Sequence, residues 1–257
     1  MSVSRASLLP LHGWTVLSLR PRGQHAALRR AAARLGARVL AVSPVALVLP
    51  DDAATRAALT AALQADIVIA TSPNAVRAAA RLHPLAARPG QPWLAVGSST
   101  RRALQRHGIA ASAPTRMDSE GLLALPALAA VAGQRIGLIT APGGRDLLAP
   151  TLTARGAQVL RAEVYARVEV PIPTRQRQAL AVALQTPQQV LLALTSGEAL
   201  AALQTQLADP TLYAVGVVAS SPRLEAQARA AGFTRIVTAA GPRPAQLLAA
   251  ATQLADR

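Results

Sequence analysis

The segment GWTVLSLRPRG, residues 13–23, returns in altered form as GQRIGLITAPGG, residues 133–144. Each copy begins with a glycine, runs through a short apolar stretch of strand type, and ends in a turn rich in proline or glycine. GARVLAV, residues 36–42, returns at the same displacement as GAQVLRA, residues 156–162. The sequence therefore contains an internal repeat of α/β type.

Two further pairs of segments continue the repeat with a slightly larger displacement. DIVIATSPNAV, residues 66–76, pairs with QVLLALTSGEAL, residues 189–200. AVGSSTRRALQRHG, residues 95–108, pairs with VVASSPRLEAQARAAG, residues 217–232. Because four blocks keep their order, we predict two copies of one unit with about five strands each.

Short apolar runs alternate with longer stretches of helical spacing along the whole chain. Such alternation predicts parallel sheets with helices on both faces. Glycines stand where the helices should end in a left-handed residue, at Gly36, Gly108, Gly156 and Gly232. The predicted strands are residues 15–19, 38–42, 66–70, 92–96, 109–113, 135–139, 158–165, 189–194, 213–218 and 235–239.

Composition narrows the classes of protein and partner. The 257 residues suffice for two ordinary domains, and 51% are hydrophobic but only 2% aromatic, so the core must be aliphatic. All 27 basic residues are arginines, and the net charge of +15 suits an anionic partner, either nucleic acid or a small polycarboxylate. A general bias of composition toward arginine explains most of this charge equally well.

Several kinds of chemistry and location are excluded or disfavoured. The chain has no cysteine, which removes disulfides and thiolate chemistry, and its four histidines show no i, i+4 pair, so we expect no metal. No cofactor-binding motif is present either. The start of the sequence lacks the apolar stretch of a secretory signal, and no run is long enough to span a membrane. We expect a soluble, cytoplasmic protein.

The junctions between strands and helices carry the polar residues of interest. Ligands of open parallel sheets bind beyond the carboxyl ends of the strands, where helix N–H groups point outward. Hydroxyls and glycines recur there in both copies, as in Thr71-Ser72 and Thr195-Ser196. Simple helix capping is an alternative explanation for each hydroxyl. Because GxSxG, GxxxxGK[ST] and GxGxxG motifs are all missing, an enzyme of this kind would act by positioning and electrostatics.

Five blocks resemble the uroporphyrinogen-III synthase family and occur in the family's order. They are TSPNAV at residue 71, AVGSSTRRALQRHG at 95, DSEGLLALP at 118, GLITAPGGRDLLAPTLTARGAQVLRAEVYAR at 137 and TSGEAL at 195. The run from residue 143 to 167 is the most specific. The chain departs from a common family pattern at residues 221–224, which read SPRL where other members have GPTT.

The resemblance implies an α/β fold of two flavodoxin-like domains with parallel sheets, joined by a two-stranded β linker, with the active-site cleft between them. One domain would comprise residues 1–41 and 169–257, and the other residues 44–161. The bridging strands would lie at about residues 38–46 and 160–169.

The resemblance also implies an activity. A uroporphyrinogen-III synthase is a cyclising hydro-lyase that dehydrates hydroxymethylbilane and closes it to uroporphyrinogen III, with inversion of ring D through a spiro intermediate and without a cofactor. Tyr165 matches the family's linker tyrosine and would be the catalytic weak acid, although it could instead simply fill the domain interface. The residues implied in substrate binding are Arg20, Ser72, Ser99, Thr100, Ser196 and Arg223.

Other functions remain open from the sequence alone. A non-enzymatic two-lobed protein that binds a small polyanion would show the same repeat. A nucleic-acid binder would match the charge, but few aromatic residues could stack on bases and no recognised motif is present. We therefore expect the small molecule hydroxymethylbilane as partner, no nucleic acid or membrane, and a monomer.

Overall fold

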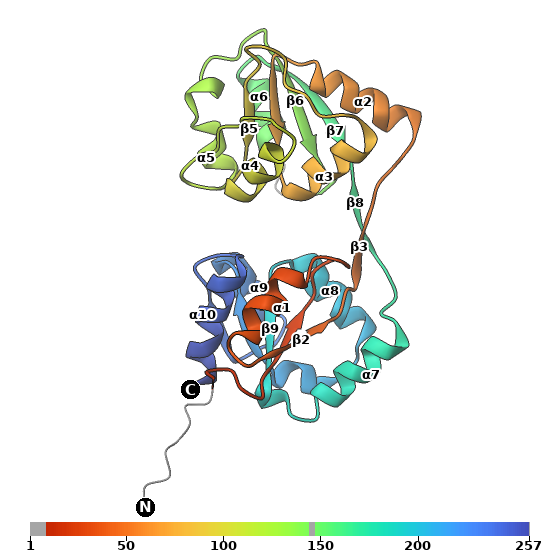
Figure 1. Ribbon diagram of the computed structural model, residues 1–257, viewed down its shortest axis with the longest axis vertical. Helices are drawn as coiled ribbons and strands as arrows, with labels where there is room; N and C mark the ends of the chain where they lie inside the picture. Colours follow the sequence, from red (N-terminus) through yellow and green to blue (C-terminus); the bar gives the residue numbers. More distant parts are fainter. Residues whose placement is uncertain (1–8, 144–146, 257) are drawn as a thin grey trace, which may run out of the picture. The chain divides into compact units, whose positions relative to one another are not determined.

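The computed structural model describes residues 9–143 and 147–256, which form two compact units (Figure 1). Unit 1 comprises Met1–Ala46 and Val168–Arg257, and unit 2 comprises Leu47–Arg167. The predicted division put these boundaries a few residues away, at residues 41, 44, 161 and 169. The Ala- and Leu-rich sequence of residues 145–155 predicts a helix, and the start of that helix falls within residues 144–146, which lie outside the described residues.

Unit 1 is built on a five-stranded sheet in the order β11-β10-β9-β1-β2, with all neighbours parallel. Numbered within the unit, this is the flavodoxin order 2-1-3-4-5. Helices α1 and α10 cover one face of the sheet, and α7, α8 and α9 cover the other. The strands are β1 Thr15–Ser18, β2 Arg38–Ala41, β9 Val190–Leu194, β10 Gly216–Ala219 and β11 Ile236–Thr238, and the helices are α1 Ala26–Ala33, α7 Thr174–Ala183, α8 Gly197–Gln206, α9 Pro222–Ala230 and α10 Pro244–Ala255.

Unit 2 has a four-stranded parallel sheet in the order β5-β4-β6-β7, extended at its β5 edge by a parallel bridge between Leu94 and Ser112. Counted from β6, the order is again 2-1-3-4-5. Helices α2, α3 and α4 pack on one face, and α5 and α6 on the other. The strands are β4 Ile67–Ala70, β5 Trp93–Ala95, β6 Arg135–Thr140 and β7 Gln158–Glu163, and the helices are α2 Ala53–Leu63, α3 Pro73–Leu82, α4 Ser98–Gln105, α5 Ser119–Leu123 and α6 Leu148–Ala154.

The strands of each sheet come from both sequence repeats. The first repeat contributes β1 and β2 to unit 1, but its later strands β4 and β5 belong to unit 2. The second repeat contributes β6 and β7 to unit 2, and its later strands β9, β10 and β11 complete unit 1. Each unit therefore joins the first part of one repeat to the second part of the other.

Two strands lie where the chain passes between the units. β3, Val45–Val48, and β8, Ala166–Glu169, form a separate two-stranded sheet (Figure 1). The predicted bridging segments began too early, because residues 38–41 form β2 and residues 160–163 belong to β7. Those residues hydrogen-bond to β1 and β6 in the main sheets.

Most predicted strands are present within a residue or two, with two exceptions. Residues 109–113 form only the bridge at Ser112. The predicted strand 213–218 starts late, because a short 3-10 helix, Pro210–Ala214, occupies its beginning. Pro210 suits the first turn of a helix, and the Asp209 carboxylate accepts a hydrogen bond from the Thr211 N–H there. The structure confirms the α/β class with parallel sheets.

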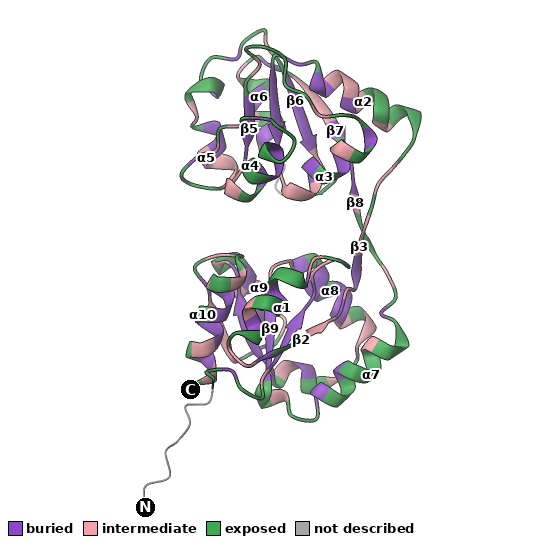
Figure 2. Ribbon diagram, viewed as in Figure 1, coloured by how far each residue is buried: buried purple, intermediate pink, exposed green. Residues whose placement is uncertain are grey.

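Glycine permits the expected helix ends. Gly36 and Gly156, which are equivalent in the two repeats, have φ of 83° and 82°, values that favour glycine over any residue with a Cβ. The cores are mainly aliphatic. The central strands β1, β4, β9 and β10 are buried along their whole length, whereas β2, β7 and β11 are only partly buried, and the helices have a buried and an exposed side (Figure 2). Trp93 and Tyr165 are the largest fully buried side chains. None of the helices within the described ranges has the length and apolar character needed to cross a bilayer.

Candidate functional site

Unit 2 contains a cavity of about 200 Å³ at the carboxyl ends of its strands. Parallel register aligns Thr140 with Glu163, and the Thr71 N–H donates to the Ile139 carbonyl, so β4, β6 and β7 end side by side at this edge. This is the edge at which open α/β sheets bind ligands. The lining residues are Thr71, Ser72, Val96, Ser119, Leu138, Thr140, Ala141, Gly143, Leu148, Arg161, Tyr165 and Arg167.

Tyr165 is held in this cavity by three polar contacts. Its ring is buried, with 2% of the residue exposed, and its hydroxyl lies 3.1 Å from the Ser72 Oγ. The Arg167 Nη2 donates to the Tyr165 hydroxyl oxygen at 3.2 Å, and its guanidinium carbon lies 5.5 Å from the ring centroid. Ser72 caps α3, because its Oγ accepts a hydrogen bond from the Ala75 N–H at 3.0 Å.

The number of hydrogens in this chain of contacts determines what it can donate to a ligand. An N–H donor stands at each end, from Arg167 and from Ala75. The two hydroxyls between them own two hydrogens, and their mutual hydrogen bond uses one. The other hydrogen is left over by these contacts, and it belongs to one of two side chains that both line the cavity. The group therefore offers one hydroxyl proton, from either Tyr165 or Ser72.

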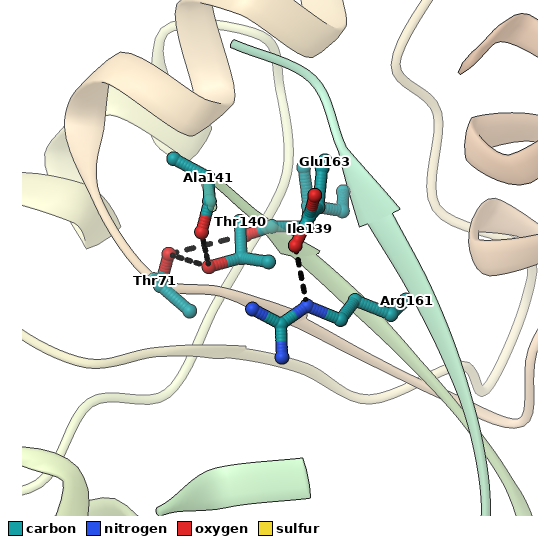
Figure 3. Close-up of polar contacts among 6 residues, drawn as sticks. All are labelled: Thr71, Ile139, Thr140, Ala141, Arg161 and Glu163. Atoms are coloured by element: carbon teal, nitrogen blue, oxygen red, sulfur yellow. Dashed lines mark hydrogen bonds and ion pairs between the residues drawn. The ribbon is translucent and has the colours of Figure 1, made fainter. Parts of the chain in front are cut away.

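A second pair of hydroxyls, those of Thr71 and Thr140, lines the same cavity (Figure 3). The Thr71 Oγ1 lies 3.1 Å from the Thr140 Oγ1 and 3.3 Å from the Ile139 carbonyl oxygen, and the Thr140 Oγ1 lies 3.4 Å from the Ala141 carbonyl oxygen. On the neighbouring strand β7, the Arg161 Nε forms an ion pair with Glu163 at 2.8 Å. Whichever threonine donates to the other, both hydroxyl hydrogens are taken up by protein oxygens.

The corresponding edge of unit 1 contains a buried histidine. His25, only 5% exposed, places its Nδ1 3.0 Å from the Ser18 Oγ and its Nε2 3.0 Å from the Ser43 Oγ. Because the Ser43 hydroxyl donates to the Arg20 carbonyl at 2.8 Å, it must accept from a protonated Nε2. The neutral ring then accepts a hydrogen bond at Nδ1 from Ser18. This network ties β1 and α1 to the segment that leads into β3.

We predict that His25 makes unit 1 less stable in acid. Burial, and then the charges of Arg29 and Arg20, lower the pKa of His25 below its ordinary value of 6.5. The unfolded chain therefore takes up a proton as pH falls below about 6.5 while the folded chain resists it, so the free energy of unfolding decreases there. Urea unfolding at pH 8 and pH 5 measures this, with a Trp93→Phe background so that Trp14 reports unit 1.

His25→Gln is the matched variant for this prediction. Its urea midpoint should fall less than that of the parent between pH 8 and pH 5, because every other ionisable group is common to the two proteins and cancels in the difference. Equal losses in the two proteins would show that His25 does not contribute to the acid sensitivity.

The structure brings only some of the predicted site residues together. Tyr165 and Ser72 share the cavity of unit 2. In the same unit, Ser99 is exposed and Thr100 is 2% exposed, both in the first turn of α4 and neither lining the cavity.

The other predicted residues belong to unit 1. Ser196 caps α8, since its Oγ accepts a hydrogen bond from the Ala199 N–H at 3.3 Å. Arg20 donates through Nη2 to the Pro242 carbonyl at 2.8 Å, and burial lowers its pKa. Arg223 is exposed on α9. Capping, the alternative explanation for the hydroxyls, thus applies to both Ser72 and Ser196.

Sequence reasoning missed four polar residues that line the cavity, which are Ser119, Thr140, Arg161 and Arg167. Signals in the sequence pointed to two of them. Arg167 lies two residues after Tyr165, so in extended chain it falls on the same side. Thr140 is the counterpart of Arg20 in the second repeat, so its position at the end of a strand could have been predicted from the repeat.

Comparison with known proteins identifies relatives. The family model described as uroporphyrinogen-III synthase HemD matches residues 26–249. The uroporphyrinogen-III synthase of Salmonella typhimurium is 41% identical over 110 residues, which are 40% of this chain and 44% of that protein. That of Escherichia coli strain K12 is 34% identical over 149 residues, 55% of this chain and 58% of that protein. The matched segments thus span about half the length of these relatives.

Solved structures show the same fold. A mutant uroporphyrinogen III synthase from the extremely thermophilic bacterium Thermus thermophilus superposes with a TM-score of 0.61 at 22% identity, covering 95% of this chain and 99% of that one. The uroporphyrinogen-III synthetase of Helicobacter pylori 26695 gives a TM-score of 0.62 at 13% identity, covering 94% and 99%. The family model extends over most of both units, from the start of α1 into α10. The chain belongs to the uroporphyrinogen-III synthase family.

Proposed function

We propose that the protein is a uroporphyrinogen-III synthase, which converts hydroxymethylbilane to uroporphyrinogen III and water. Family membership supports the reaction, and one observation in this chain supports it chemically. The buried Tyr165 lines a cavity, and its hydroxyl forms hydrogen bonds with the Arg167 guanidinium and with Ser72, the N-cap residue of α3. This group can supply a proton where a hydroxyl has to leave.

The chemistry requires such a proton at its first step. The carbon–oxygen bond of the bilane's hydroxymethyl group breaks with electrons from the adjacent pyrrole nitrogen, and the hydroxyl departs as water with a proton from the Tyr165–Ser72 pair. The resulting azafulvene is attacked by ring D, and the spiro intermediate opens and closes again with ring D inverted. Loss of a ring proton at the end returns the proton to the enzyme, so acid and base balance.

Positioning of the substrate has to provide most of the remaining rate enhancement. The reaction needs one conformation of a flexible chain of four rings, and holding it converts an improbable encounter into an intramolecular one. We assign the carboxylates of the substrate to the hydroxyls and amides at the strand ends, namely Ser72, Ser99, Thr100 and Ser196. Arg20 and Arg223 are weaker candidates, because the Arg20 guanidinium already binds the Pro242 carbonyl.

Product analysis tests the function directly. The purified protein is supplied with enzymatically generated hydroxymethylbilane, and the products are oxidised and separated as uroporphyrin isomers. Isomer III is expected, whereas isomer I alone, which forms spontaneously, would rule out synthase activity. Size-exclusion chromatography of the same preparation tests the accompanying proposal of a monomer.

We predict that Tyr165→Phe lowers kcat for isomer III on the order of 10²-fold, at the low end for loss of a general acid. Some activity should remain, because Ser72 keeps its hydroxyl and the positioning groups are intact. Tyr213→Phe is the matched control, since Tyr213 lies in unit 1, where its hydroxyl accepts from Gln204. Unchanged kcat in Tyr165→Phe would remove the phenol from the mechanism.

A further inference from the structure

The size of the cavity limits what part of a tetrapyrrole it can take. Pockets that bury a drug-sized ligand measure roughly 300–1,000 Å³. The cavity of unit 2 measures about 200 Å³. It is therefore too small for four linked rings but suited to one ring with its short side chains.

One side of the cavity presents hydrogen-bond acceptors. One of the two hydroxyls of Thr71 and Thr140 donates its hydrogen to the other, and the remaining hydrogen goes to the carbonyl of Ile139 or Ala141. Both hydrogens are used in either arrangement, which leaves oxygen lone pairs for a ligand. Figure 3 shows these two hydroxyls meeting at the ends of β4 and β6. A ligand group that can only donate suits this side.

The adjoining side presents donors. It consists of the Arg167 guanidinium and the single hydroxyl hydrogen left over by Tyr165 and Ser72. Ser72 follows Thr71 directly in the chain, so the two sides meet at this pair of residues. A carboxylate, which when ionised can only accept hydrogen bonds, suits the donor side, and the guanidinium adds charge.

We propose that this cavity holds one pyrrole ring of the substrate, with the ring N–H donated to the hydroxyl oxygen of Thr71 or Thr140 and a carboxylate side chain bound by Arg167, which leaves the hydrogen of the Tyr165–Ser72 pair for the departing hydroxyl. A pyrrole N–H is a donor without acceptor capacity, and the ring's acid side chains are acceptors without hydrogens. The acceptor side of the cavity therefore matches the ring N–H, and the donor side matches the acid side chain. This inference rests on the proposed function, because it names the part of that substrate which unit 2 binds.

The test pairs a change in the ligand with a change in the full-length protein. The probes are a monopyrrole carrying one acetic and one propionic acid side chain, its furan analogue, and its dimethyl ester, each titrated by calorimetry or NMR. The furan has an oxygen in place of the N–H at nearly the same size. In the wild type we expect the furan to bind about 5- to 10-fold more weakly than the pyrrole.

The variants show which residues cause these preferences. In Thr71→Val/Thr140→Val the pyrrole should lose affinity and the furan penalty should disappear, and Thr71→Ser/Thr140→Ser should restore the penalty. In Arg167→Met the ester penalty should shrink while the furan penalty stays. Thermal unfolding verifies that each variant is folded.

Either of two results would overturn the inference: no preference for pyrrole over furan in the wild type, or the same preference in the valine variant. The wild-type titration decides even if that variant does not fold. Formation of isomer III with no such preference would leave the synthase function standing without this subsite. Selective pyrrole binding without formation of isomer III would support the subsite and contradict the synthase function.

Discussion

Residues 47–167 expressed alone are expected to fold into a stable sheet, whereas residues 9–132, a segment of nearly equal length that contains one complete sequence repeat, are expected to remain unfolded. The first segment holds all strands of the unit 2 sheet and the cores on both its faces. The second has β1 and β2 without β9, and β4 and β5 without β6. Far-UV circular dichroism and thermal unfolding of both segments check this.

The two segments are expected to differ in their unfolding transitions. Both contain Trp93, and with Trp14→Phe in segment 9–132 its fluorescence reports burial in each. Segment 47–167 should give one cooperative transition with Trp93 shielded, and segment 9–132 should give none. A cooperative transition in segment 9–132 would mean that a sequence repeat can form its own sheet, and the pairing of β4 with β6 would then not be needed for folding.

Gly137→Ala is expected to destabilise unit 2 by about 3 kcal/mol, near the upper end of the usual cost of overpacking. Gly137 lies in the middle of β6, paired with Val68 on one side and Leu160 on the other. A Cβ there would overlap the backbone carbonyl of Ala62 in α2, and backbone cannot rotate aside as a side chain can. Unit 2 should unfold roughly 10 °C lower, measured by Trp93 fluorescence in a Trp14→Phe background.

Gly97→Ala serves as the matched control for that loss. Gly97 has an extended φ of −159°, and an added Cβ would lie 3.4 Å from the Met117 Cβ, within ordinary contact. Its midpoint should stay within a few degrees of the parent. A Gly137→Ala variant as stable as Gly97→Ala would show that α2 can move away from β6 at little cost.

The repeat, the strand positions and the parallel sheets could be predicted because each depends on local pattern. Short apolar runs, glycines at helix ends and hydroxyls at junctions act within a few residues, as at Gly36 and Ser72. The discontinuous division into units came from resemblance and not from pattern. The strands of both repeats look alike, so nothing local distinguishes β9 from β4 as the partner of β1.

The candidate site was predicted only in part for a related reason. Tyr165 and Ser72 come from segments far apart in the chain, and their contact depends on β4 and β7 ending at one edge of the sheet. Arg167 and Thr140 lacked any motif of their own. Conversely, the charge of Arg20 suggested an anion, but in the fold its guanidinium meets a backbone carbonyl.

The interleaving of the two repeats affects how the chain can fold while it is synthesised from its amino terminus on the ribosome. When the ribosome has released residues 1–167, unit 2 has all its strands, but β1 and β2 still wait for β9, β10 and β11. At 5–20 residues per second, the interval before the last of them emerges is roughly 4–14 s. Until β9 emerges, the nascent chain displays the open edge of β1 and the apolar side of α1, so chaperone demand should fall on the amino-terminal segment.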